Sequence, residues 1–329
     1  MGCQLCNGED PNQLEMDIKD EAQKAKSGGG RLRAGNPGRH GQQQTPTKNI
    51  FSIQAGAIID SICPVSSEQF AVGLSTGTIV IYAMKSPTPT QEYTLTGHSG
   101  TIKSLIHLKD GRLASAGGDA TIKIWRLYER RLDVDMTSHT NWVNALLQPK
   151  DTDIIISGSS DNTIKITNLL NMNKVEHTFN VEKNVNCLCD LLDGKFASNS
   201  GDQIIVWDLN TKTKLFDFDG AFSTIVSLVY LQDGKLISGA LNGVVKVYDI
   251  NTKQRVMNIK DSGNLNMLRM ISKNVLAVAI GNGIKLRDIN TKNEIRTLTG
   301  HSEEVRVITP FEGNLLISGG ADKLIKVWE

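Results

Sequence analysis

The sequence predicts an all-β fold, a β-propeller of seven blades. After residue 47, a short run that ends in an aromatic residue, or in its substitute, recurs seven times. The aligned positions are Tyr82, Trp125, Thr167, Trp207, Tyr248, Arg287 and Trp328. Successive positions lie 39 to 43 residues apart. Seven repeats of about 40 residues are typical of propeller blades with four strands each.

A second alignment supports the same fold, because two positions of every repeat are apolar. Counted from the position of His98, the residues four further on are Ile59, Ile102, Val143, Val185, Ile225, Leu265 and Val305. The residues seven further on are Ile62, Leu105, Leu146, Leu188, Leu228, Leu268 and Ile308. A strand that is buried on both faces shows this pattern. We therefore expect one buried inner strand in each repeat.

Short motifs in these repeats carry a resemblance to a known family. The segments "TLTGHSG" (94–100) and "TLTGHSE" (297–303) nearly match, and "MTSHTN" (136–141) holds the same place in its repeat. The further motifs are Gly97-His98, Gly300-His301, Trp207-Asp208, Tyr248-Asp249 and the tight turns that end in Asp119, Asp161 and Asp322. Over residues 48–329 the chain resembles the WD-repeat, β-transducin-type propellers. Blades one and six depart from the pattern, since Val72 and Val278 replace a serine and Arg287 replaces tryptophan, which puts their polar networks in question.

The resemblance implies how the ring closes. In such repeats each sequence unit supplies the outer strand of the preceding blade and then three strands of its own. Residues 49–53, "NIFSI", correspond to an outer strand but have no earlier blade to join. We expect this strand to pair with the C-terminal "IKVWE" and so remove an exposed sheet edge.

Serine, histidine and aspartate recur together in three blades. They are His98, Ser115, Asp119 and Trp125; His139, Ser157 and Asp161; and His301, Ser318, Asp322 and Trp328. Such residues can form a nucleophilic triad, but an active site normally occurs once in a chain. A tryptophan N–H that bonds the serine oxygen also leaves it a poor nucleophile. We interpret the sets as structural networks that satisfy buried polar groups.

Other chemistry is not indicated by the sequence. His40, His107 and His177 make no metal-ligand spacing with acids or cysteines. Cys187 and Cys189 alternate with Leu188 in an expected inner strand, where free cysteines act as small apolar fillers. A propeller enzyme would need an unrepeated cluster of acids or histidines at the central channel, and none is found. The sequence therefore predicts no enzyme activity, no metal and no cofactor.

The charge and the cysteine content indicate which class of partner and which cellular compartment to expect. The formal net charge is +1, so there is no bias towards nucleic acid. The five cysteines form no disulfide framework, which favours a reducing cytoplasm. No apolar run reaches the roughly 18 residues that span a bilayer. Protein partners are expected instead.

The resemblance places protein partners on the face that bears the turns into the inner strands. The position three past the histidine lies there, and it holds Ile58, Thr101, Trp142, Asn184, Thr224, Asn264 and Glu304. Trp142 is therefore a candidate exposed contact, since tryptophan is enriched in binding hot spots. Alternatively, it packs over the neighbouring turn as local cover. The expected polar surround is Lys103, Asn144, Asn186, Asn266 and Arg306.

The N-terminal 47 residues read as a separate, disordered tail. Between residues 7 and 47 only seven of 41 residues are apolar, too few to offset the entropy of ordering. The start, "MGCQLC", resembles the dually acylated tails of signalling kinases and G-protein α subunits. Myristate on Gly2 and palmitate on Cys3 or Cys6 would tether the chain to the cytoplasmic side of a membrane. However, Cys6 stands where the acylation motif has serine or threonine, so an unmodified start and a soluble scaffold are the alternative.

Overall fold

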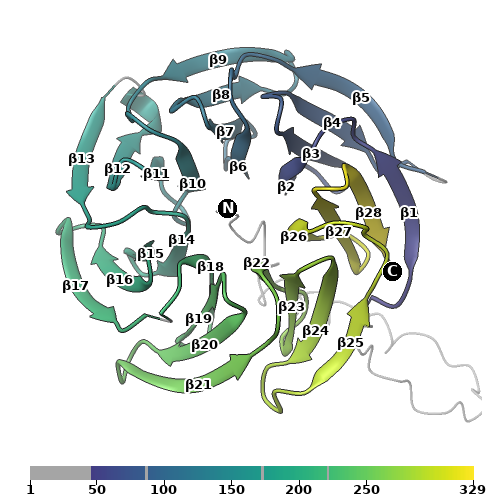
Figure 1. The fold of residues 1–329 in the computed structure, drawn as a ribbon. Helices are drawn as coiled ribbons and strands as arrows, with labels where there is room; N and C mark the ends of the chain where they lie inside the picture. Colours follow the sequence, from purple (N-terminus) through teal and green to yellow (C-terminus); the bar gives the residue numbers. More distant parts are fainter. Residues whose placement is uncertain (1–45, 86–87, 172–173, 221) are drawn as a thin grey trace, which may run out of the picture. The chain divides into compact units, whose positions relative to one another are not determined.

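The chain folds into a ring of seven four-stranded antiparallel sheets, which confirms the predicted seven-bladed propeller (Figure 1). The structure, a computed structural model, describes residues 46–329 apart from 86–87, 172–173 and 221. The expected tail, with Gly2, Cys3 and Cys6, lies outside the described residues but for its last two. Among the described residues there are 28 strands and one short 3-10 helix, η1 (Leu169–Asn171).

Each blade contributes one strand to the centre of the ring. These inner strands are β2 (Ile59–Pro64), β6 (Ile102–His107), β10 (Val143–Leu147), β14 (Leu188–Leu192), β18 (Ile225–Leu231), β22 (Leu265–Met270) and β26 (Val305–Phe311). The second strands are β3 (Gln69–Leu74), β7 (Leu113–Gly117), β11 (Ile154–Ser159), β15 (Lys195–Ser200), β19 (Lys235–Ala240), β23 (Val275–Ile280) and β27 (Leu315–Gly320).

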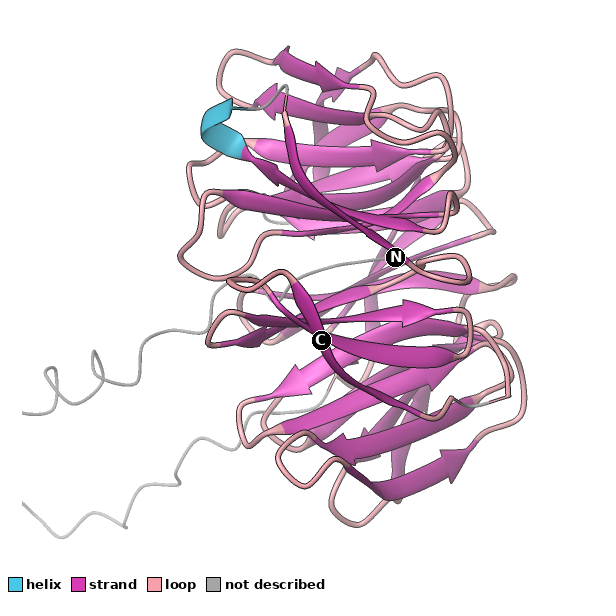
Figure 2. Ribbon diagram, turned by 90° about the vertical axis from the view of Figure 1, so that its left-hand side faces the viewer, coloured by secondary structure: helices cyan, strands magenta, loops and turns pink. Residues whose placement is uncertain are grey.

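The outer half of each blade holds the repeated aromatic position. The third strands are β4 (Ile79–Ala83), β8 (Ile122–Arg126), β12 (Thr163–Asn168), β16 (Gln203–Asp208), β20 (Val244–Asp249), β24 (Gly283–Asp288) and β28 (Leu324–Trp328). The outermost strands are β5 (Thr90–Leu95), β9 (Arg131–Met136), β13 (Val175–Asn180), β17 (Thr213–Phe218), β21 (Gln254–Lys260), β25 (Glu294–Leu298) and β1 (Asn49–Gln54). Because neighbouring strands are antiparallel, their connections alternate between the two faces of the ring (Figure 2).

The ring is closed by the strand that was expected to close it. β1 pairs antiparallel with β28, with Ile53 opposite Ile325. The last blade therefore has the order β1-β28-β27-β26 and joins the two ends of the described chain. Just before β1, the backbone N–H groups of Thr47 and Lys48 both donate to the carbonyl of Glu329.

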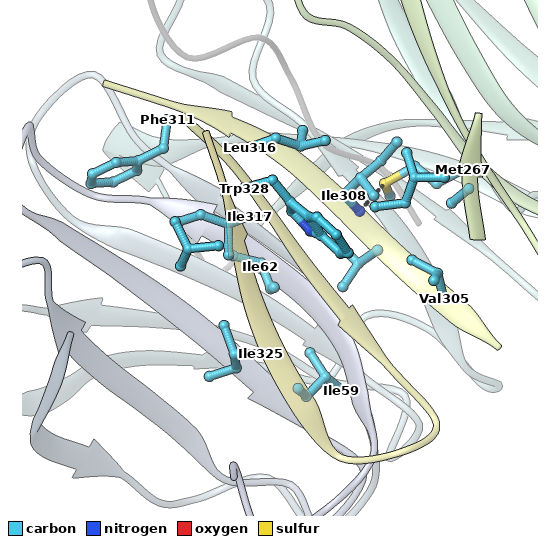
Figure 3. Close-up of a cluster of buried hydrophobic side chains, with 14 of the residues drawn as sticks. Ile59, Ile62, Met267, Val305, Ile308, Phe311, Leu316, Ile317, Ile325 and Trp328 are labelled. Atoms are coloured by element: carbon cyan, nitrogen blue, oxygen red, sulfur yellow. Dashed lines mark hydrogen bonds between the residues drawn. The ribbon is translucent and has the colours of Figure 1, made fainter. Parts of the chain in front are cut away.

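The two apolar positions of the inner strands form the contacts between blades. Every residue of both aligned sets is buried. In the closing blade, Ile59 and Ile62 of β2 lie in one cluster with Ile317 and Trp328 (Figure 3). A Cβ at Gly319 would lie 2.4 Å from Cγ2 of Ile59, so only a residue without a side chain lets β2 approach the last blade this closely.

Blade four departs from the expected inner strand. β14 begins at Leu188, so Cys187 precedes the strand and only Cys189 lies in it. The cause is Asn199, whose side-chain oxygen accepts the backbone N–H groups of Asn186 (2.7 Å) and Cys187 (3.0 Å) in place of the strand ladder. Burial raises the pKa of both thiols to about 12, so neither is a reactive thiolate near neutral pH.

Candidate protein-binding face

The repeated polar sets form buried chains of hydrogen bonds. In blade two, the indole N–H of Trp125 donates to Oγ of Ser115 (2.7 Å), and Nε2 of His98 lies 2.7 Å from the same oxygen. Nδ1 of His98 lies 2.9 Å from the Asp119 carboxylate. The carboxylate accepts from Nδ1–H, which leaves Nε2 to accept the serine O–H. The serine oxygen is thus held on both sides.

The same geometry recurs in blades seven and three. In blade seven, Ser318 lies 2.8 Å both from Nε2 of His301 and from Nε1 of Trp328. In blade three, Nε2 of His139 lies 2.8 Å from Oγ of Ser157, and Nδ1 lies 2.9 Å from Asp161. All three serines are buried, so no substrate can reach them in this conformation. The sets tie the second and third strands to the turn that precedes each inner strand.

These networks make the stability of the fold depend on pH. Burial lowers the pKa of all three network histidines, against the opposing effect of the facing aspartates. Burial alone would raise the pKa of Asp161, but hydrogen bonds from Thr163, the Thr140 N–H and His139 lower it to about 2. In both cases the folded chain binds fewer protons than the unfolded chain.

We therefore expect the melting temperature to fall as the pH drops below about 6.5, the value for a histidine in an unfolded chain. The loss should begin with the three histidines and continue below pH 4, where unfolded aspartates take up protons. A melting series by circular dichroism between pH 8 and pH 3.5 measures this. A melting temperature that rises between pH 7 and pH 5.5 would contradict the neutral, buried histidines.

The two divergent blades replace the network by other contacts. In blade six, Asp261 stands at the histidine position, and its carboxylate accepts from Nε of Arg287 at 3.0 Å and from Nζ of Lys285 at 2.8 Å. A buried ion pair thus occupies the place of the histidine and tryptophan. In blade one, the rings of Phe70 and Tyr82 stack with centroids 5.4 Å apart. In both blades, other side-chain contacts therefore take the place of the serine network, since valine replaces the serine.

Trp142 lies on the expected face, half covered and half open. Its side chain is 49% exposed. Nζ of Lys103 lies 5.0 Å from the centroid of the ring, within the range of a cation–π contact. The indole also passes close to the turn of the neighbouring blade, since a Cβ at Gly118 would lie 3.7 Å from its Cε2. The ring therefore covers that turn and still offers apolar surface to solvent.

The five polar residues that were expected around Trp142 are not equally exposed. Lys103 and Arg306 both contact Oδ1 of Asp60, at 3.5 Å and 2.9 Å, and Asp60 itself is only 1% exposed. Asn144 and Asn266 are buried, because their amides donate to the carbonyls of Val185 and Val305 in the next blade, each at 3.0 Å. These two asparagines join neighbouring blades. Lys103, Arg306 and Asn186 keep partly exposed side chains.

One exposed aromatic residue on this face was not predicted from the sequence. Phe222, in the connection between β17 and β18, is 98% exposed, and Leu241 of the adjacent turn is partly exposed. The repeat alignment holds the signal. At the position of Phe222 the other six repeats have Gly56, Ser99, Thr140, Glu182, Ser262 and Ser302. An aromatic residue at a position that is otherwise small or polar marks a special surface feature of blade five.

Comparison with known families matches the three repeats that hold a histidine–serine–aspartate network. The family model described as "WD domain, G-beta repeat" matches residues 89–126, 131–168 and 292–329. The chain carries WD repeats in three places. Each matched WD repeat spans the outer strand of one sheet and the first three strands of the next. The three are those that contain His98, His139 and His301.

Several known proteins share weaker similarity with the chain. The small ribosomal subunit protein RACK1 of Caenorhabditis elegans is 25% identical over 164 residues, which cover 44% of this chain and 48% of that protein. The Neurospora crassa protein of the same name is 26% identical over 154 residues, with coverages of 43% and 48%. The serine-threonine kinase receptor-associated protein of Mus musculus is 23% identical over 251 residues, with coverages of 72% and 69%. The chain thus spans about half the length of the two RACK1 relatives.

In the part of the chain that the structure describes, no group of three or more histidine, cysteine, aspartate or glutamate side chains is placed to hold a metal ion. Nor does any helix there have the length and apolar character needed to cross a membrane.

Proposed function

We propose that this chain is a non-catalytic scaffold that binds other proteins on the face bearing Trp142. The observation that carries the proposal is the indole of Trp142, half exposed beside the Lys103 ammonium. A large, rigid and partly desolvated aromatic side chain is the kind of residue that dominates binding energy in interfaces. Lys103, Arg306 and Asn186 supply polar groups near the inner ends of the blades, and Phe222 adds a second apolar contact in blade five. The buried Ser–His–Asp sets serve the fold rather than catalysis.

We further propose that residues 1–47 form a tail that tethers this scaffold to the cytoplasmic face of a membrane. Support comes from the sequence "MGCQLC", in which Gly2 is the acceptor for myristate and Cys3 and Cys6 offer thiols for palmitate. In this proposal the chain has two parts, the tail of residues 1–47 and the propeller domain of residues 48–329. The tether would hold the binding face near membrane-bound partners and leave it open.

A second candidate is the same scaffold without a lipid, as a soluble subunit of a larger complex. Two relatives carry the name "small ribosomal subunit protein", which favours this alternative. Mass spectrometry of the N-terminal peptide separates the two, because only the tethered form carries an acyl chain on Gly2.

The binding face is tested by Trp142→Ala. We expect the substitution to weaken partner binding by about 2 kcal/mol or more, a factor of about 30, because it removes a central aromatic contact. Partners that co-purify with the tagged wild-type chain should be depleted in quantitative mass spectrometry. The matched control is Tyr128→Ala, since Tyr128 is 99% exposed in the β8–β9 connection on the opposite face.

Melting curves show whether either variant has lost its fold. Asp161→Ala provides the contrasting result, because it breaks a buried network and should lower the melting temperature. A Trp142→Ala protein that folds normally and retains every partner would refute the role of Trp142.

A further inference from the structure

One buried positive charge near the axis of the ring has no counterion among the residues that the structure describes. Arg269 lies on the inner strand β22 and is 4% exposed. Its Nη1 donates to the carbonyl of Leu268 at 2.8 Å. Within residues 46–329, outside the three undescribed gaps, its Nη2 has no hydrogen-bond partner and no carboxylate forms an ion pair with Arg269. A guanidinium removed from water without a partner is strongly destabilising.

The residues at the same level of the ring cannot neutralise this charge. The equivalent positions in the other inner strands hold Cys63, Ile106, Leu147, Cys189, Val229 and Thr309. None of them carries a carboxylate. Asp190, the next residue of β14, accepts the backbone N–H groups of Lys150 at 2.8 Å and Leu192 at 3.0 Å.

Arg269 belongs to blade six, yet its charge reaches blade four. Burial raises the pKa of Cys187 and Cys189, and the positive charge of Arg269 acts against that rise. Blade five and its inner strand β18 separate the two blades around the ring (Figure 1). The guanidinium therefore faces the centre of the ring, where the inner strands converge.

The remaining charges near the axis also favour an anion. Asp60 and the two cations that contact it, Lys103 and Arg306, lie three residues nearer the Trp142 face along the inner strands. Three residues of a strand correspond to about 10 Å. Together with Arg269, Lys103 and Arg306 give three positive charges against the two negative charges of Asp60 and Asp190 on the inner strands.

We propose that Arg269 binds an oxyanion, a phosphate or a carboxylate, at the centre of the propeller. The planar guanidinium offers N–H groups in a fork that fits the oxygens of either group. A water molecule would satisfy the hydrogen bond of Nη2 but not its charge.

The probe is inorganic phosphate, titrated at constant ionic strength against the melting temperature of the full-length chain. Binding to the folded state should give a saturable rise of about 3 °C at ten times the dissociation constant. In Arg269→Met this saturable rise should vanish, leaving only the general effect of phosphate on protein stability. Arg255→Met, which removes an exposed charge from β21, should respond like the wild type.

A further variant guards against loss of folding. Arg269→Lys keeps the charge without the fork and should respond more weakly than the wild type. The proposal is overturned if the wild type does not respond, or if Arg269→Met responds as fully as the wild type.

Discussion

Deletion of residues 1–54 should lower the melting temperature of the whole ring by about 10 °C or more, whereas deletion of residues 1–44 should leave it nearly unchanged. The longer deletion removes all of β1 and its ladder to β28. It also removes Phe51 and Ile53, which pack against the core of the last blade. Half-buried side chains of this size contribute about 1 kcal/mol or more each, and each kcal/mol corresponds to a few degrees in a domain of this size.

The effect should spread beyond the last blade, because β1 is what joins the two ends of the ring. Without it, the polar groups of β28 that face β1 form an exposed sheet edge. Two side-chain bonds are lost as well, from Nζ of Lys326 to Ser52 (2.8 Å) and from Nδ2 of Asn49 to the Val327 carbonyl (3.1 Å). Calorimetry of both truncated proteins measures the difference. Equal melting temperatures would show that β1 does not hold the ring closed.

Substitution of Gly2 by alanine should move the protein from the membrane fraction wholly into the soluble fraction. The expectation rests on the proposed acylation. A single myristoyl chain gives only marginal binding, with an association constant of about 10⁴ M⁻¹. Stable anchoring therefore needs a second signal. The sequence offers Cys3 and Cys6 for a second acyl chain, and basic residues between Lys24 and Arg39 for anionic headgroups.

The second signal can be separated from the first. Each basic residue held near the surface adds roughly 1 kcal/mol, but this run begins about twenty residues from Gly2, so its help should be partial. Replacement of Cys3 and Cys6 together by serine should give intermediate binding that weakens with salt. Fractionation of wild type and both variants decides the matter. An unchanged distribution of Gly2→Ala would eliminate the acyl anchor and favour the soluble scaffold.

The repeat period was enough to predict the blades and their inner strands, and the resemblance to WD-repeat propellers implied the closing strand. Both apolar positions are buried in all seven repeats, because each inner strand packs between two neighbouring blades. This packing is a direct consequence of hydrophobic pattern. The sequence alone therefore located residues such as Ile59 and Leu268 correctly in the core.

The polar residues of the inner strands were harder to interpret. Asn144 and Asn266 lie at a register shift of the ladder, between Val143 and Ala145 and between Leu265 and Met267. At this irregularity the amide reaches a carbonyl of the next blade, about 40 residues along the chain. Whether a polar side chain finds such a partner depends on how two blades pack, which periodicity does not reveal.

In blade six, the sequence contains a signal for a contact between two aligned positions. Asp261 stands at the histidine position and Arg287 at the tryptophan position of the same repeat. Opposite charges at two positions that are in contact in other blades predict an ion pair, which the structure contains. No sequence pattern indicated the unpaired charge of Arg269. Its lack of a partner among the described residues becomes visible only in the folded chain.

The central claim is that protein partners bind the face that bears Trp142, and lysine cross-linking of a purified complex tests it most directly. Lys183 and Lys323 lie in connections on this face, whereas Lys195 and Lys273 lie at turns on the opposite face, and all four are exposed. The account predicts cross-links from partners to Lys183 and Lys323, lost together with the complex in Trp142→Ala. Cross-links that concentrate on Lys195 and Lys273 would contradict it.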